Sequence, residues 1–416
     1  MFQSTNHQIN QLLNKKCLRY VQAYHFKDKK ALIRLDLNVP LNERYEVADD
    51  TRIQGAIPTI RQVIDQGGAA ILLSHLGRPE QGYEERFSLQ HLVAPLSRAL
   101  GTPVKFAPSC IGPDTQIQVQ QLRLGEVLLL ENVRFQPGET ACDPDLARAL
   151  AAWGDVYIND AFGTAHRAHA STAGVAHHFQ DKLAGYLIHQ ELISAGKVLH
   201  AHERPLIAII GGAKISDKIK PVEQLIDRVD SLLLGGGVAN TFQKALGGQL
   251  GASLVEDDQL DLARQLARQA QQKGVQLILP ADVVAASGIE SETGQKIVAS
   301  GAVPADWLAL DIGPQARHTF TAQIQAAKTI LWCGPIGVFE KPAFQHGTKA
   351  VAGAVAEATR KGTFSLIGGG DSAAAIKSLG YVGQVSHIST GGGALLAYLG
   401  GAPLPGIESL KGDYER

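Results

Sequence analysis

Arginine and histidine residues follow several short apolar segments in the first half of this 416-residue sequence. Guanidinium groups present N–H donors in a planar fork, which suits a small ligand that carries phosphate and carboxylate groups. A single surface arginine is usually only solvated, but repetition at successive segment ends favours a binding role. Asp36 and Asn38 add acceptors for a hydroxyl group of the same ligand. The basic residues in these positions are Arg52, His75, Arg78, Arg134, His166, Arg167 and His169. For His166 and His169, a packed or solvated side chain is an equal alternative.

Glycine clusters take the corresponding positions in the second half, and glycine supplies 44 of the 416 residues. A glycine turn that leads into a helix offers free N–H groups and the helix dipole to phosphate oxygens. Lys214 and Lys218 add positive charge, and Asp371 is a candidate ligand for magnesium. Glycine also ends helices and permits close packing, so one cluster alone is weak support. Five clusters favour a nucleotide-phosphate site: 211–212, 235–237, 334–337, 368–370 and 391–393.

The segments that must position these residues alternate between apolar strands and amphipathic helices. Apolar strands with little polar alternation are typical of parallel sheets covered by helices on both faces. Alternating strands and helices predict open, doubly wound α/β sheets, and eleven strands are too many for one twisted sheet, so we expect two α/β domains. The predicted strands are 31–35, 69–74, 104–106, 127–130, 155–158, 206–210, 231–234, 276–279, 329–332, 364–367 and 385–388, and the helices named in the first half are 51–66, 88–100 and 143–153.

The predicted joint is a helical stretch over residues 186–204, closed by Pro205. The first domain then covers residues 1–185 and the second covers residues 205–403. Residues 1–30 are polar and weakly patterned, and we expect them to form an appendage to the first domain.

Composition excludes several classes of protein. Lys and Arg total 39 against 40 Asp and Glu, so neither nucleic acid nor an anionic membrane surface is an expected partner. The four cysteines form no CxxC pair, which argues against a zinc site and indicates a reducing compartment. No apolar run is long enough to span a bilayer, and the N-terminus lacks a signal-peptide core, so we expect a cytoplasmic protein.

An anion site in one domain and a magnesium-nucleotide site in the other predict phosphoryl transfer with domain closure. No strand-end carboxylate is free to serve as a base, which favours an acceptor that is already ionised, a carboxylate. Neither a GxxxxGK[ST] loop nor the HRD and DFG motifs of protein kinases occur. The stretch 368–373 fits a relaxed dinucleotide pattern, but the following strand lacks the acidic residue that binds ribose, which disfavours a dehydrogenase.

The order and spacing of eight motifs resemble the phosphoglycerate kinase family over residues 30–410. The motifs are RxDxNxP, SHLGRP, ENVRF, DAFGTAHRAH, GGAK...DK, WxGPxGVFE, GGGDS and HxSTGGGA. The resemblance implies two Rossmann-like, doubly wound parallel-sheet domains joined by a linker helix, with a C-terminal tail (about 404–416) that returns to the first domain. It implies reversible transfer of phosphate between 1,3-bisphosphoglycerate and MgADP, which gives 3-phosphoglycerate and MgATP. A monomer is expected.

The same resemblance assigns roles to individual residues. It implies that 3-phosphoglycerate binds Asp36, Asn38, Arg52, His75, Arg78, Arg134 and Arg167. Arg52, Lys214, Lys218 and Gly393 are implied in catalysis, with Arg52 stabilising the phosphoryl group during transfer. The implied nucleotide-binding residues are Gly212, Lys218, Gly236, Glu340, Gly369, Gly370, Asp371 and Ser372, and Asp371 would also bind Mg²⁺.

Cys333 departs from the family pattern, which usually has asparagine at this position. A thiol cannot donate as an amide does, so a contact to phosphate is in doubt and the thiol is a candidate for oxidation. The favoured interpretation is a small residue that is simply tolerated at a strand end. This departure motivates a second hypothesis, a catalytically impaired homologue that binds nucleotide as a scaffold.

Overall fold

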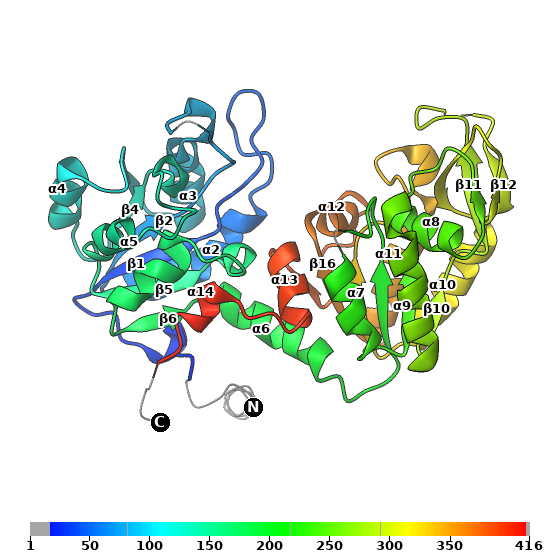
Figure 1. Cartoon of the computed structure of the whole chain (residues 1–416). Helices are drawn as coiled ribbons and strands as arrows, with labels where there is room; N and C mark the ends of the chain where they lie inside the picture. Colours follow the sequence, from blue (N-terminus) through cyan, green and yellow to red (C-terminus); the bar gives the residue numbers. More distant parts are fainter. Residues whose placement is uncertain (1–16, 81, 217, 292, 413–416) are drawn as a thin grey trace. The chain divides into compact units, whose positions relative to one another are not determined.

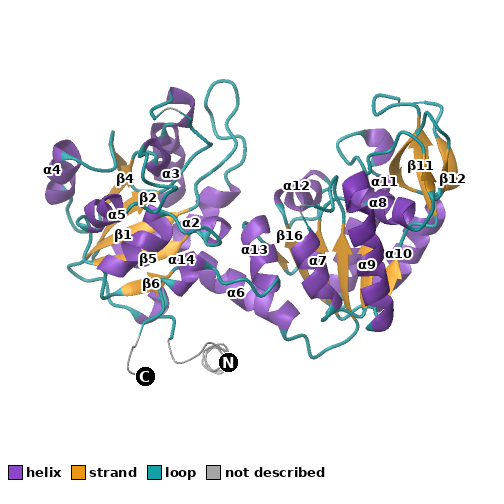
Figure 2. Cartoon of the chain, in the orientation of Figure 1, coloured by secondary structure: helices purple, strands orange, loops and turns teal. Residues whose placement is uncertain are grey.

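The computed structural model describes residues 17–412 except 81, 217 and 292, and it divides into two compact units. Unit 1 comprises Met1–Ile193 with Pro403–Arg416, and unit 2 comprises Ser194–Ala402 (Figure 1). Helices flank the strands of each unit (Figure 2). Each unit is therefore an α/β layered structure, as the alternating sequence pattern predicts.

Among the described residues, unit 1 contains a six-stranded sheet in the order β3-β4-β2-β1-β5-β6, and every neighbouring pair is parallel. Its strands are β1 (Lys30–Leu35), β2 (Ala69–Leu73), β3 (Val104–Ala107), β4 (Val127–Leu130), β5 (Val156–Asp160) and β6 (Lys182–Ala184). Its helices are α2 (Thr51–Asp65), α3 (Val93–Leu100), α4 (Pro113–Gln121), α5 (Pro144–Ala151) and α14 (Pro405–Glu408). The short edge strand β6 is absent from the sequence prediction, because three residues carry too little pattern to identify.

The N-terminal segment is more than the appendage that its polar sequence predicts. Val21 and Phe26 are fully buried and belong to the hydrophobic core of unit 1. Tyr20 forms an isolated parallel bridge with Ala184 at the end of β6. The prediction of a mere appendage is therefore wrong for residues 17–30, where apolar side chains are buried in unit 1, and residues 1–16 lie outside the described residues.

Unit 2 has a second sheet of six parallel strands in its described residues, in the order β10-β8-β7-β15-β16-β17. These strands are β7 (Leu206–Ile210), β8 (Ser231–Leu234), β10 (Gln276–Ile278), β15 (Thr329–Cys333), β16 (Phe364–Gly368) and β17 (His387–Ile388). The helices are α7 (Ile219–Ile226), α8 (Gly236–Ala245), α9 (Leu260–Gln272), α10 (Pro314–Ala326), α11 (His346–Arg360), α12 (Gly370–Ser378) and α13 (Gly392–Leu399).

Unit 2 also carries small sheets that the sequence does not predict. An antiparallel sheet has the order β12-β11-β14, and a two-stranded parallel sheet joins β13 to β9. Their bounds are β9 (Gln249–Leu250), β11 (Asp282–Ala286), β12 (Lys296–Ala299), β13 (Ala302–Val303) and β14 (Leu308–Ile312). β9 and β13 have two residues each and β12 is mostly exposed, so for these three strands the partner strand, and not a local hydrophobic pattern, determines that they form.

The predicted joint forms helix α6 (Tyr186–Leu199), which ends five residues before the predicted end at residue 204. The boundary between the units falls between Ile193 and Ser194, inside this helix. At the other end of the chain, Asn159 donates to the carbonyl of Gly406 at 3.0 Å, and Gly406 N–H donates to Ala165 O at 2.9 Å. These bonds attach α14 to the loop that follows β5, and the two lie close together in Figure 1.

Candidate active site in two parts

The carboxyl ends of the unit 1 strands lie at one edge of the sheet. Leu35 at the end of β1 pairs with Asp160 at the end of β5, and Arg34 pairs with Leu73 at the end of β2. β1 and β5 are neighbours in this sheet. From β1 the chain continues to β2 on one side of the pair, and from β5 it continues to β6 on the other side. Ligands of open α/β sheets bind at such a point of divergence, so the β1 and β5 loops are the expected binding loops.

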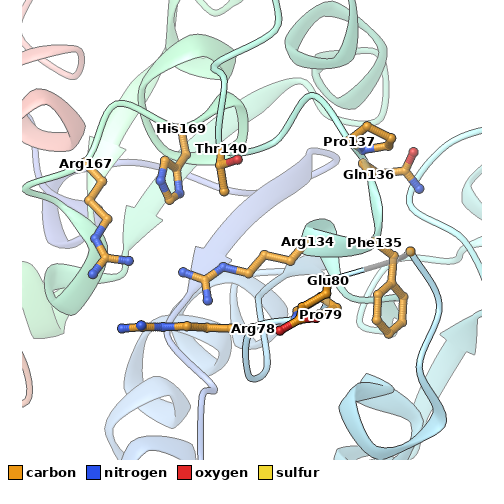
Figure 3. Close-up of a pocket in the computed structure, with 11 residues that line it drawn as sticks. Arg78, Pro79, Glu80, Arg134, Phe135, Gln136, Pro137, Thr140, Arg167 and His169 are labelled. Atoms are coloured by element: carbon orange, nitrogen blue, oxygen red, sulfur yellow. The ribbon is translucent and has the colours of Figure 1, made fainter.

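A cavity of about 440 Å³ opens among the loops that follow β2, β4 and β5. Figure 3 shows the guanidinium groups of Arg78, Arg134 and Arg167 extending toward one region, with the imidazole of His169 beside it. The wall also includes one carboxylate, Glu80. Three of the predicted substrate residues therefore meet in one basic cavity, which is suited to a multiply charged anion.

The other four predicted substrate residues lie outside this cavity wall, and three of them, Asp36, Asn38 and Arg52, are joined by hydrogen bonds. Asp36 accepts a hydrogen bond from Arg52 Nη1 at 2.6 Å, and the carboxylate is almost fully buried. Asn38 Oδ1 accepts from Gly77 N–H at 2.8 Å, while Arg134 donates to Gly77 O at 2.5 Å. Gly77 thus joins this group to the cavity, and its φ of +62° is readily accessible only to glycine.

The pKa of His75 falls well below its usual range, first because of burial and then because of the positive charges of Arg34, Arg134, Arg52 and His169. The pKa of Arg134 is also lowered, by burial and by the charges of Arg167, Arg34 and Arg78. Such mutual repulsion requires the cations to lie close together. An anion would relieve it, so the charge arrangement by itself favours anion binding.

The pKa of His169 is lowered to about 4, by burial first and then by Arg34, Arg134, Arg167 and His166. Its Nδ1 lies 3.8 Å from Glu139 Oε1, too far for a hydrogen bond. We expect an NMR titration of the ligand-free protein to give a midpoint near pH 4. A phosphate-bearing ligand should raise this midpoint, since it offsets the repulsion. A midpoint at the ordinary value of about 6.5 would contradict this account.

The same lowered pKa predicts the direction of a change in stability. Between about pH 6.5 and pH 4 the unfolded chain binds a proton at His169 that the folded chain does not. The free energy of unfolding should therefore fall as the pH falls through this window. Replacing His169 by glutamine should weaken that dependence in urea unfolding measured at pH 7 and pH 5.

Three buried residues behind the cavity are absent from the sequence prediction. Arg34 in β1 is 1% exposed, and Glu139 and Ser171 are buried beside it. Ser171 contacts both of the others through its hydroxyl group. Arg34 could have been noticed in the sequence, because it is a charged residue inside an otherwise apolar strand. No sequence pattern distinguishes Glu139 or Ser171.

In unit 2 the corresponding point of divergence lies between β7 and β15. Gly211 N–H donates to Cys333 O, and Gly212 N–H donates to Pro335 O at 2.8 Å, so the loops continue to pair beyond the strands. A Cβ added at Gly211 would lie 2.0 Å from Pro335 O, and one added at Gly334 would lie 2.2 Å from Gly211 O. Glycine is required at these two positions because two backbones pack closely. Close packing was the alternative to phosphate binding in the sequence analysis.

Three glycine clusters lead into helices, as predicted: α8 begins at Gly236, α12 at Gly370 and α13 at Gly392. Their free N–H groups and dipoles suit phosphate oxygens. Gly212, in the loop after β7, has a φ of +103°, and Gly369, directly before α12, has a φ of +93°. Gly393 is exposed in the first turn of α13.

The charged residues predicted for the nucleotide are mostly accessible. Lys214, Glu340 and Asp371 are exposed, and Lys218 is partly buried near Gly212. Ser372 differs from them because it is fully buried and its Oγ accepts from Gly334 N–H at 2.6 Å. Its hydroxyl group thus links α12 to the loop after β15.

The structure does not support Cys333 as a candidate for oxidation. The side chain is 1% exposed at the end of β15, and burial raises the pKa of the thiol to about 12. The reactive thiolate is therefore suppressed. The buried side chain fits the favoured interpretation, a small residue tolerated at a strand end.

Over the part of the chain that the structure describes, no helix combines the length and the apolar character needed to cross a membrane. Within the same residues, no group of three or more histidine, cysteine, aspartate or glutamate side chains is arranged to hold a metal ion.

Known proteins are similar to this chain over most of its length. The model of the family described as phosphoglycerate kinase matches residues 21–402. The chain is 49% identical to the phosphoglycerate kinase of Moorella thermoacetica over 383 residues, which is 92% of this chain and 96% of the relative. It is 48% identical to that of a Synechococcus species over 398 residues, which is 94% of this chain and 97% of the relative.

Solved structures show the same similarity. The structure of phosphoglycerate kinase from Coxiella burnetii matches with a TM-score of 0.84 and 40% identity over 94% of this chain and 98% of that one. The enzyme from Pyrococcus horikoshii matches with a TM-score of 0.83 and 29% identity over the same shares. On the strength of these similarities across nearly the whole sequence, the chain belongs to the phosphoglycerate kinase family.

Proposed function

We propose that this protein is the glycolytic phosphoglycerate kinase, a phosphotransferase with a carboxyl group as acceptor. It transfers a phosphoryl group between 1,3-bisphosphoglycerate and MgADP, giving 3-phosphoglycerate and MgATP, and it also runs in reverse. The observation that carries the proposal is the cavity of Arg78, Arg134 and Arg167 at the carboxyl edge of the unit 1 sheet. This charge suits a ligand with both phosphate and carboxylate groups.

In unit 1, we assign 3-phosphoglycerate to the basic cavity and to the group around Gly77. Arg78, Arg134 and Arg167 bind its anionic groups. Asp36 holds Arg52 through the 2.6 Å contact and so orients the guanidinium that stabilises the phosphoryl group during transfer. His75 and Asn38 complete the set with polar contacts to the substrate.

In unit 2, we assign the nucleotide to the loops after β7, β8, β15, β16 and β17. Lys214 and Lys218 bind the phosphates and the transferring group, and Glu340 binds the ribose hydroxyls. Gly212, Gly236, Gly369 and Gly370 supply backbone contacts, and Gly393 places the first turn of α13 behind the reacting group. Ser372 acts in this proposal by holding α12 against Gly334.

The residues present fit a magnesium ion that arrives with the nucleotide. Asp371 offers an exposed carboxylate in the first turn of α12, and Mg²⁺ prefers oxygen ligands shared with phosphates and water. Asp371 would hold the ion, and the ion would neutralise charge on the phosphate oxygens. The carboxylate of 3-phosphoglycerate is ionised at neutral pH, so these residues need no general base.

A coupled assay tests the proposal directly. Purified protein with saturating MgATP and 3-phosphoglycerate should turn over, and omission of either substrate should abolish the signal. Calorimetry with MgADP identifies the competing hypothesis, since binding without turnover would indicate an impaired homologue. Absence of turnover at saturating substrates contradicts the assignment.

The proposal also requires that Arg52 of unit 1 and Lys214 of unit 2 act on one phosphoryl group. We therefore expect the two substrates together, but neither alone, to make the protein more compact. Small-angle X-ray scattering measures this as a smaller radius of gyration. An unchanged radius with both ligands bound counts against domain closure.

We further propose that the enzyme is a cytoplasmic monomer that acts on small molecules and binds neither nucleic acid nor membranes. The balanced charge supports the absence of nucleic acid and membranes among its partners, and the absence of a CxxC pair supports a reducing compartment. Light scattering of the purified protein tests the monomer, with a mass of 44.3 kDa expected.

A further inference from the structure

We propose that a buried chain of hydrogen bonds behind the basic cavity fixes the tautomer of His75, with the proton on Nε2. Arg34 contacts His75 directly, and Ser171 and Glu139 are positioning residues that hold Arg34. The consequence for substrate binding rests on the proposed function, whereas the tautomer itself does not.

Arg34 begins the chain of contacts. It lies in β1 between two parallel neighbours, and its side chain is excluded from solvent. Its Nε donates to Ser171 Oγ at 2.8 Å, and a guanidinium nitrogen donates to the carbonyl of Leu35. A guanidinium group has only donors, so every group that it contacts in this way must accept.

Ser171 transmits the constraint to a carboxylate. Its Oγ donates to Glu139 Oε1 at 2.6 Å, and its backbone N–H donates to Glu139 Oε2 at 2.9 Å. The serine hydroxyl has a single proton, which it gives to Glu139, so it presents a lone pair to Arg34. Glu139 is 1% exposed and supplies the negative charge that a buried guanidinium needs.

The guanidinium group of Arg34 also contacts the imidazole of His75. Arg34 Nη2 lies 3.3 Å from His75 Nδ1. Because the guanidinium cannot accept, this contact is a hydrogen bond only if Nδ1 is unprotonated, which places the single proton of the neutral imidazole on Nε2. Burial and the surrounding cations lower the pKa of His75 and keep the ring neutral, in agreement with this geometry.

The tautomer determines what His75 offers to a ligand. Within residues 17–412 as described, no protein group is hydrogen-bonded to His75 Nε2. A protonated Nε2 is a donor, which suits an anionic or hydroxyl acceptor on 3-phosphoglycerate. The opposite tautomer would present a lone pair and repel an anion, so the chain of contacts selects the form that can bind.

Nitrogen NMR of histidine-labelled, ligand-free protein at pH 7 tests this proposal, because the two ring nitrogens have distinct shifts when protonated or unprotonated. The wild-type His75 should show an unprotonated Nδ1 and a protonated Nε2. Ser171→Ala and Glu139→Gln should move the two shifts toward each other, as expected for a mixture of tautomers.

Ser88→Ala is the matched control. Ser88 is also buried in unit 1 and donates to a buried glutamate, Glu131, at 2.7 Å, but neither residue contacts Arg34 or His75. This variant should leave the His75 shifts as in the wild type.

A proton on Nδ1 in the wild type, or a charged ring at pH 7, overturns the proposal even if both variants fail to fold. If folded Ser171→Ala has the same His75 nitrogen shifts as the wild type, the positioning role of Ser171 is overturned. None of these readouts requires turnover, so a failure here is distinguishable from a failure of the kinase assay.

Discussion

Replacing Arg52 by alanine should lower the turnover number at least about a hundredfold. The proposed role of Arg52 is to stabilise charge on the phosphoryl group during transfer, an interaction that is stronger in the transition state than in the bound substrates. The loss should therefore appear in kcat as well as in kcat/KM. Steady-state kinetics with MgATP and 3-phosphoglycerate measures both.

Arg61→Ala is the control for this prediction. Arg61 lies in the same helix, α2, where it pairs with Asp65 at 3.3 Å and donates to the carbonyl of Leu100. Its removal should leave turnover close to that of the wild type, because neither contact involves a residue of the candidate site. A kcat for Arg52→Ala equal to that of the wild type would remove Arg52 from catalysis. A higher KM with unchanged kcat would assign it to substrate binding alone.

Gly334→Ala should destabilise unit 2 by about 3 kcal/mol or more. The new Cβ would lie 2.2 Å from the carbonyl oxygen of Gly211, and the backbone φ of +99° is strained for any residue with a side chain. The two loops could separate only by losing the hydrogen bonds that continue from β7 and β15. Urea unfolding should show a lower midpoint.

Gly370→Ala separates packing from phosphate binding. A Cβ at Gly370 meets no atom within 4 Å, so the variant should unfold at the same urea concentration as the wild type. If Gly370 contacts the nucleotide as proposed, the KM for MgATP should rise while the KM for 3-phosphoglycerate stays constant.

For Gly334→Ala, a free energy of unfolding equal to that of the wild type would refute the packing argument.

Part of the candidate site could be predicted because chemistry-bearing residues follow apolar strands directly. Arg78 and Arg134 are close in space for a simple reason: the strands before them are parallel, so their carboxyl ends meet at one edge. The positions of Arg34 and Glu139 could not be predicted in this way. They lie behind the binding surface, where a role depends on which side chains pack together.

The glycine clusters likewise have features that the sequence predicts and features that depend on packing. Their placement at strand ends could be recognised from the sequence, and so could the helices that follow Gly236 and Gly370. Whether a given glycine serves a ligand or a neighbouring backbone depends on distances between loops that are remote in sequence. Gly334 and Gly370 differ in this respect although both stand in glycine-rich turns.

By itself, the amino-acid sequence determined the α/β class, the parallel character of the two main sheets and the family, because these depend on local hydrophobic pattern and on motifs with fixed spacing. Only the tertiary structure decided that Phe26 belongs to the core, that the thiol of Cys333 is buried and unreactive, and that Asp36 pairs with Arg52. Burial, ionisation and hydrogen-bond partners are set by segments that meet only after folding, so no local pattern contains them.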